Sequence, residues 1–158
     1  MDTYLTFVLG EECFAVSVSN VLEVFQKQPV TKIPRTPEHI LGIINFRGEI
    51  LPVVDTRCKF SLPASPEDKH IVIVFETNTI PKLTIAATAD AVQGVIDISS
   101  EEIKPVPELG LSYNVTFIQG AVRKDETFIL MLNIDKVFSA KDLAVVQEIQ
   151  PTEEQTQH

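Results

Sequence analysis

The 158-residue chain is poor in the residues that most often carry out catalysis or bind metals. It has two cysteines, three histidines and six glycines, and the glycines are scattered singly, without a phosphate-binding pattern. Cys13 and Cys58 lie too far apart to suggest a metal or redox motif, and no histidine stands at short spacing from another histidine or a cysteine. The sequence therefore predicts a protein without enzymatic activity, bound metal or cofactor.

Basic residues and long apolar runs are also scarce. The chain has 13 lysines and arginines against 22 aspartates and glutamates, and its net charge of −9 argues against binding to nucleic acid or anionic membranes. No apolar run approaches the roughly 18 to 20 residues that span a bilayer, and the N-terminus lacks the features of a signal peptide. We therefore expect a soluble, cytoplasmic protein with reduced cysteines.

Short segments of β-forming residues, separated by prolines and polar turns, make up most of the chain. They predict an all-β sandwich or barrel, with helix confined to residues 135–146 and a polar, disordered tail over residues 151–158. Residues 18–24 are expected to form a turn that leads into a strand, and the proline-rich residues 28–37 an extended loop. The other predicted strands cover residues 3–9, 13–18, 40–46, 50–54, 70–75, 83–89, 91–98, 116–122 and 127–132.

The hairpin predicted over residues 40–54 carries more apolar residues than a sheet with one wet face can bury. Its two apolar runs flank a polar turn in which Gly48 tolerates a positive φ. Because side chains alternate along a strand, these apolar residues face both sides of the sheet, so each side must be covered. We expect Ile43, Leu51 and Val53 to be divided between a core shared by two halves of the protein and contacts with partners. The alternative, which we favour for most of these residues, is that they belong to the core alone.

Part of the chain repeats itself weakly. The two copies lie near residues 14–60 and 83–138, and they predict two related half-barrels. The first copy has Arg47 in its hairpin turn where the second has Asp125, so the repeat does not require the arginine, which becomes a functional candidate. At a displacement of 78 residues, the identical pairs include Ile40 and Ile118, Gly42 and Gly120, and Phe60 and Phe138.

Residues 42–48, Gly-Ile-Ile-Asn-Phe-Arg-Gly, followed by Leu-Pro-Val-Val-Asp-Thr-Arg over 51–57, resemble the CheW family of chemotaxis coupling proteins. The resemblance covers roughly residues 4–146. It implies a single CheW-like domain over residues 1–150, with two five-stranded SH3-like β-barrels around a shared apolar interface and a short C-terminal helix. It also implies a non-catalytic adaptor that joins the cytoplasmic tips of methyl-accepting chemoreceptors to a CheA-type histidine kinase in membrane receptor arrays.

The same resemblance assigns roles to individual residues. It places the arginine of the family on Arg47 and its paired glutamate on Glu23, which we expect to form an ion pair across neighbouring strands. Val21 and Gly42 match positions of the receptor-binding groove, which lies between the two barrels in the family. The sequence therefore predicts a receptor-binding site at these four residues.

A kinase contact is predicted in the proline-stiffened loop. Val30 and Ile33 are candidates for exposed apolar anchors, because a stiff loop loses little entropy on docking, and the alternative is a lid over the barrel. Phe25 stands where the family commonly has a basic residue, and Thr56 where leucine is usual. These departures leave open an adaptor of a non-flagellar, pilus-linked array. A small-molecule-binding barrel is the alternative from another class, and it requires a pocket with converging polar groups.

Overall fold

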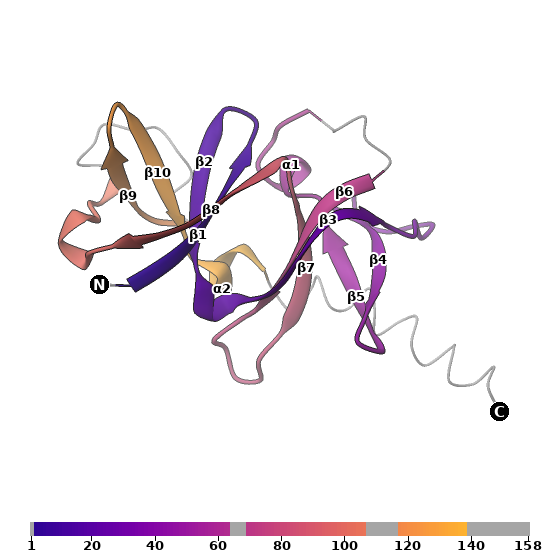
Figure 1. The fold of residues 1–158 in the computed structure, drawn as a ribbon. Helices are drawn as coiled ribbons and strands as arrows, with labels where there is room; N and C mark the ends of the chain where they lie inside the picture. Colours follow the sequence, from indigo (N-terminus) through magenta and orange to yellow (C-terminus); the bar gives the residue numbers. More distant parts are fainter. Residues whose placement is uncertain (1, 64–68, 107–116, 139–158) are drawn as a thin grey trace.

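A computed structural model describes residues 2–63, 69–106 and 117–138 of the chain. Within these ranges ten strands form two five-stranded sheets, with the orders β8-β1-β2-β10-β9 and β3-β6-β7-β5-β4 (Figure 1). The strands are β1 (Asp2–Leu9), β2 (Glu12–Ser17), β3 (Val21–Pro29), β4 (Ile40–Phe46), β5 (Glu49–Val54), β6 (Lys69–Glu76), β7 (Thr84–Ala89), β8 (Ala91–Ile98), β9 (Ile118–Lys124) and β10 (Thr127–Leu132).

Each sheet closes on itself through one additional antiparallel pair. Barrel 1 (β1, β2, β8, β9 and β10) closes where Lys104 pairs with Ala121, and barrel 2 (β3 to β7) closes where Thr31 pairs with Ile43. The two barrels lie side by side, with barrel 1 on the left and barrel 2 on the right of Figure 1. This arrangement confirms the all-β prediction of two five-stranded, SH3-like barrels.

Alternation along the strands supplies three separate apolar cores. In β6, Ile73 and Phe75 face a large cluster that draws residues from both sheets, whereas Val72 and Val74 face a cluster drawn from barrel 2 alone. A third cluster fills barrel 1. The largest cluster is therefore the shared apolar interface between the barrels, and it explains why these strands are apolar on both faces.

The β4–β5 hairpin is buried on both sides, but not in the way its sequence suggests. Leu51 and Val53 are fully buried inside barrel 2, and Val54 and Ile40 face the interface between the barrels. Leu51 and Val53 therefore belong to the core alone, as the favoured alternative expects, but it is the core inside barrel 2 and not the interface between the barrels. Ile43 remains half-buried.

The two barrels have matching architecture. Each has a hairpin whose second strand pairs in parallel with another strand, β5 with β7 and β10 with β2. Each hairpin is followed by a short helix, α1 (Thr56–Lys59) after N-cap Asp55 and α2 (Ile134–Val137) after N-cap Asn133. A common origin of the two halves in a repeat near residues 14–60 and 83–138 stays a prediction, as does a single domain over residues 1–150.

The sequence does not predict helix α1, because an aspartate that follows a strand, as Asp55 does, commonly stabilises a turn. Its carboxylate accepts a hydrogen bond from the Cys58 N–H, which caps the helix, and buried Thr56 is hydrogen-bonded to Thr88 of β7. Of the helix predicted over residues 135–146, α2 covers the beginning, and positions from 139 onward lie outside the described residues, as does the predicted tail. No helix in the described ranges is long and apolar enough to cross a membrane.

Candidate partner-binding sites

The turn between β4 and β5 presents Arg47 to solvent in a constrained conformation. Arg47 has φ 53° and Gly48 has φ 83°, the two consecutive positive values of a tight hairpin turn. The Asn45 Oδ1 atom accepts a hydrogen bond of 3.0 Å from the Gly48 N–H. The Arg47 guanidinium carbon lies 4.6 Å from the centroid of the Phe46 ring, which steadies the charged group above an aromatic face.

The backbone conformation at position 47 is unfavourable for an arginine. The left-handed conformation costs a side-chain-bearing residue about 1–2 kcal/mol, and glycine, asparagine and aspartate tolerate it best. The matching turn of barrel 1 carries Asp125, with φ 56°. The backbone conformation at position 47 favours glycine, asparagine or aspartate over arginine. The presence of an arginine there is therefore best explained by a function of its guanidinium group.

The predicted ion pair between Arg47 and Glu23 is absent, although both residues are described and exposed. The two residues are not on neighbouring strands: β3 pairs with β6, β4 pairs with β5, and β3 and β4 are the two ends of the sheet order. In addition, the pairing of β3 with β6 is irregular next to Glu23, because the register shifts between Val21 and Glu23. Arg47 therefore stacks on Phe46 instead of pairing with an acid.

The other two residues of the predicted receptor site, Val21 and Gly42, contribute to the packing of the protein. Val21 is half-buried and packs against the core shared by the barrels. Gly42 is buried on β4, and a Cβ atom added there would lie 2.2 Å from the Thr31 carbonyl oxygen. Gly42 thus allows the two strands that close barrel 2 to approach each other. Of the four predicted residues, only Arg47 and Glu23 present exposed side chains.

Val30 and Ile33 are both half-buried, not fully exposed, and their contact with the kinase stays a prediction. Val30 packs against the interior cluster of barrel 2 together with Phe25. Val30 therefore fits the alternative expectation, in which the loop forms a lid over the barrel. Phe25, one of the two departures from the family pattern, makes an edge contact with Phe46 at a centroid distance of 6.2 Å.

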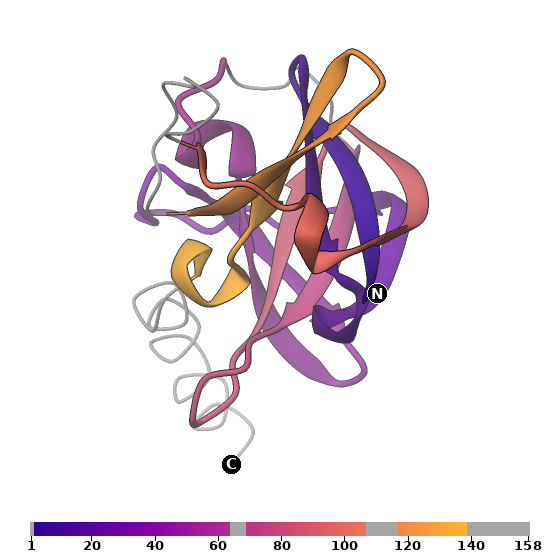
Figure 2. The ribbon, with the colours of Figure 1, turned by 90° about the vertical axis from the view of Figure 1, so that its left-hand side faces the viewer.

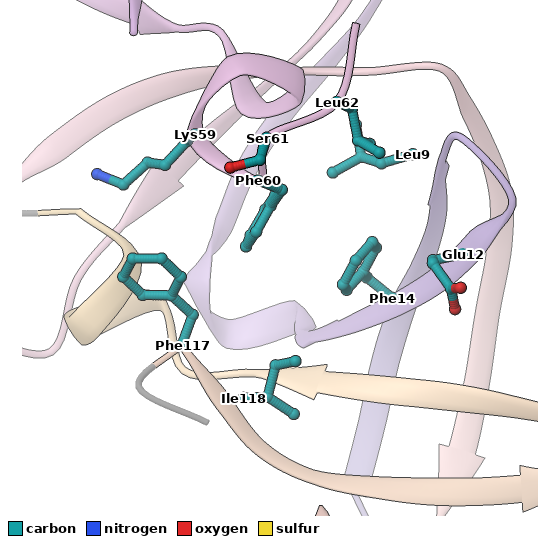
Figure 3. A pocket seen from close by; sticks show the side chains of 9 residues that line it. All are labelled: Leu9, Glu12, Phe14, Lys59, Phe60, Ser61, Leu62, Phe117 and Ile118. Atoms are coloured by element: carbon teal, nitrogen blue, oxygen red, sulfur yellow. The ribbon is translucent and has the colours of Figure 1, made fainter. Parts of the chain in front are cut away.

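An apolar hollow of about 290 Å³ lies between the barrels, beside α1, and none of the six predicted site residues lines it (Figure 3). Its rings pack in sequence: Phe14 and Phe60 stack with centroids 5.4 Å apart, and Phe60 meets Phe117 edge-on at 5.7 Å. The Lys59 amine and the Glu12 carboxylate point away from the space between the rings. The hollow lacks the converging polar groups that a small-molecule site requires.

The hollow and the Arg47 turn are separate features. Both ribbon views place the β4–β5 turn at the opposite end of barrel 2 from α1 (Figures 1 and 2). Sequence reasoning missed the hollow because its walls come from distant segments. The available signal was the weak internal repeat, which contains Phe60 but does not indicate that this ring meets Phe14 and Phe117.

A charged cluster fixes the two barrels relative to each other. Asp90, at the junction of β7 and β8, accepts hydrogen bonds from Arg57 Nε at 2.8 Å, Arg57 Nη2 at 2.7 Å and the Gly10 N–H at 2.6 Å. Arg57 belongs to α1 of barrel 2, and Gly10 to the β1–β2 turn of barrel 1. Burial would raise the pKa of Asp90, but the bonds from Arg57 and Gly10 and the Arg57 charge outweigh it and hold that pKa below its usual value.

Neither cysteine has the surroundings of a reactive thiol. Burial raises the pKa of Cys13, whose Sγ donates to Gln93 Oε1 at 3.0 Å. Burial, followed by the charges of Glu38 and Asp55, raises the pKa of Cys58. Among the residues that the structure describes, no group of three or more histidines, cysteines or carboxylates is placed to hold a metal ion.

Comparison with known proteins connects this architecture to a family. The family model for the CheW-like domain matches residues 3–142. The chain belongs to the CheW-like family. Among its relatives are the chemotaxis protein CheW of Klebsiella aerogenes, 27% identical with 92% of this chain and 87% of the relative covered, and protein FrzA of Myxococcus xanthus, 30% identical with 91% and 90% covered.

The crystal structure of the scaffolding protein TtCheW from Thermoanaerobacter tengcongensis superposes with a TM-score of 0.76 at 30% identity, covering 87% of this chain and 92% of TtCheW. The family and this likeness identify the chain as a CheW-like adaptor or scaffold protein of chemotaxis signalling. An adaptor works through its surface, so the exposed features of the CheW-like fold, rather than an internal cavity, are the candidates for function.

Proposed function

We propose that this CheW-like protein couples methyl-accepting chemoreceptors to a CheA-type histidine kinase at cytoplasmic receptor arrays. The observation that carries the proposal is Arg47, which is exposed, stacked on Phe46 and held in a conformation that an arginine adopts only at a cost. A fixed guanidinium is suited to bind carboxylates or carbonyl oxygens on a partner. Membership of the CheW-like family supports this class of partner.

The proposal divides the residues between two partners. The receptor tip binds beside Arg47 and Glu23, whose side chains are exposed, with the half-buried Val21 as an apolar neighbour and Gly42 shaping the strand beneath. The regulatory domain of the kinase docks on the loop that carries Val30 and Ile33. Co-sedimentation with receptor signalling tips, with and without the kinase, tests the scheme. We expect the protein to pellet with the tips and to increase the amount of kinase that pellets; failure to carry kinase down would refute the coupling.

Replacing Arg47 with asparagine separates binding from stability. Asparagine tolerates the left-handed conformation and forms a favourable pair with Gly48, which offsets the lost contact with the Phe46 ring. The free energy of unfolding is therefore expected to stay within about 0.5 kcal/mol of wild type. Receptor affinity is expected to fall about tenfold, the equivalent of one charge-assisted hydrogen bond.

Isothermal titration calorimetry with receptor tips and thermal unfolding of Arg47→Asn measure the two effects. Asp125→Asn, at the matching turn of barrel 1, is the control and should change neither quantity appreciably. If Arg47→Asn unfolds at a lower temperature than wild type but binds the receptor with unchanged affinity, the arginine has a structural role only.

A second candidate function is the same coupling within a non-flagellar, pilus-linked array. The observation that favours it is Phe25, which packs against Phe46 at a position where the family commonly has a basic residue. Co-sedimentation with receptor tips from each type of array distinguishes the two candidates, because an adaptor of one array is expected to bind the tips of that array more tightly.

A further inference from the structure

Four exposed basic residues lie along the seam where barrel 2 closes, in a protein whose net charge is −9. We call Lys27, Lys32, Arg35 and Arg47 the basic strip. Residues 24–37 contain the first three of these and no acidic residue. Acidic residues border the strip singly, at positions 23, 38 and 49. Over residues 24–37 the charge is therefore positive, opposite in sign to the net charge of the molecule.

The closing pair of barrel 2 brings the strip together. Thr31 and Ile43 exchange two backbone hydrogen bonds, of 3.0 and 2.8 Å, so the chain after β3 runs antiparallel to β4. The contact between Phe25 and Phe46 extends this seam toward the β4–β5 turn. Lys27 and Arg47 thus flank one end of the seam, and Lys32 and Arg35 follow Thr31 at the other.

Two features set these charges apart from ordinary solvated side chains. Within the described residues, none of the four takes part in an ion pair, whereas Arg57, Lys82 and Lys124 each do. Arg35, like Arg47, lies in the left-handed region, with φ 64°. Two of the four basic side chains are thus displayed from positions that the backbone would give to glycine or asparagine.

We infer that Lys27, Lys32 and Arg35 of the basic strip form a docking surface for an acidic segment of a protein partner, whereas Arg47, in the β4–β5 turn, belongs to the receptor site proposed above. Resting on the proposed function, the inference assigns that segment to the regulatory domain of the kinase, because Val30 and Ile33 lie among the charges of the strip. A protein segment fits better than a membrane or nucleic acid. A membrane or a nucleic acid is an extended polyanion, which the net negative charge of the whole protein repels. A short acidic segment can lie within about 8 Å of the strip, which is one Debye length, so that it interacts mainly with the basic side chains.

The double variant Lys32→Glu/Arg35→Glu tests the inference without altering Arg47. Surface plasmon resonance measures its binding to the isolated regulatory domain of the CheA-type kinase from the same genome. At about 50 mM salt we expect the Kd to rise about tenfold, mainly through slower association, and at about 500 mM salt the difference from wild type should largely disappear. Lys136→Glu, at an exposed lysine of α2, is the matched control and should leave the Kd unchanged.

The outcomes separate the inference from the function on which it rests. Regulatory-domain binding that is equally tight for wild type and the double variant at low salt overturns the inference and leaves the coupling function standing. Absence of binding by the wild type at either salt concentration refutes kinase docking itself. Vesicles of phosphatidylcholine with phosphatidylglycerol provide a further arm. If wild type binds them and the double variant does not, while kinase affinity is unchanged, the strip serves a membrane and the inference is overturned.

Discussion

Replacing Gly42 with alanine is expected to lower the free energy of unfolding by about 3 kcal/mol, the upper range for an overpacked core position. A Cβ atom at this position would lie 2.2 Å from the carbonyl oxygen and 2.8 Å from the carbonyl carbon of Thr31, and 2.9 Å from Val30 Cγ1. Thr31 cannot retreat cheaply, since both of its backbone groups are hydrogen-bonded to Ile43. The methyl group would therefore break the pair that closes barrel 2.

Gly120→Ala is the matched control, because Gly120 occupies the corresponding place in the seam of barrel 1. Its added Cβ would meet a side-chain atom, Ile103 Cγ2, at 2.7 Å and the Lys104 carbonyl oxygen at 2.9 Å. The backbone carbonyl lies farther from the added Cβ here than at Gly42, so a smaller loss of stability is expected. Chemical denaturation monitored by circular dichroism measures both. Gly42→Ala with wild-type stability and impaired receptor binding would contradict the architectural role and favour a direct contact.

The strands could be predicted because burial on both faces makes their sequences continuously apolar. Residues such as Val72 and Ile73 alternate between two apolar environments, so β6 is apolar throughout, and the need for a cover on each face followed directly. A local signal also marks the short 3-10 helix Ser100–Glu102, because its N-cap Ser99 and Glu102 form a capping box within four residues. Local signals and two-sided burial together were enough for the barrel architecture.

Details that depend on how the barrels close could not be predicted. The predicted Arg47–Glu23 pair requires β3 and β4 to be neighbours, but the sheet order places them at opposite ends. The Thr31–Ile43 bridge and the Phe25–Phe46 contact bring β4 together with β3 and the chain that follows it. Val30 packs as a lid because that same bridge draws the loop onto the barrel. Such contacts between distant segments leave no periodic trace in a single sequence.

Replacing Asp90 with alanine is expected to cost about 2 kcal/mol of stability, within the range for hydrogen bonds to a charged group. The substitution removes all three bonds that the carboxylate accepts from Arg57 and Gly10. Arg57 would keep its 2.9 Å bond to the Pro63 carbonyl oxygen but lose its counter-charge in a site where only 24% of its side chain is exposed. Asp97→Ala is the control, because that carboxylate accepts one exposed bond, from Thr3.

The pH dependence of stability tests whether charge, and not packing, is the cause. The pKa of Asp90 is lower in the folded protein than in the unfolded chain, where an aspartate titrates near about 3.9. Its contribution is therefore complete above about pH 4 and is lost as the pH falls through the folded-state value. Asp90→Asn keeps the shape but cannot ionise. The gap in unfolding free energy between wild type and Asp90→Asn should be constant near neutral pH and narrow below about pH 4. A gap that persists unchanged in acid would mean that the amide fits the site badly and that the charged link between the barrels contributes little.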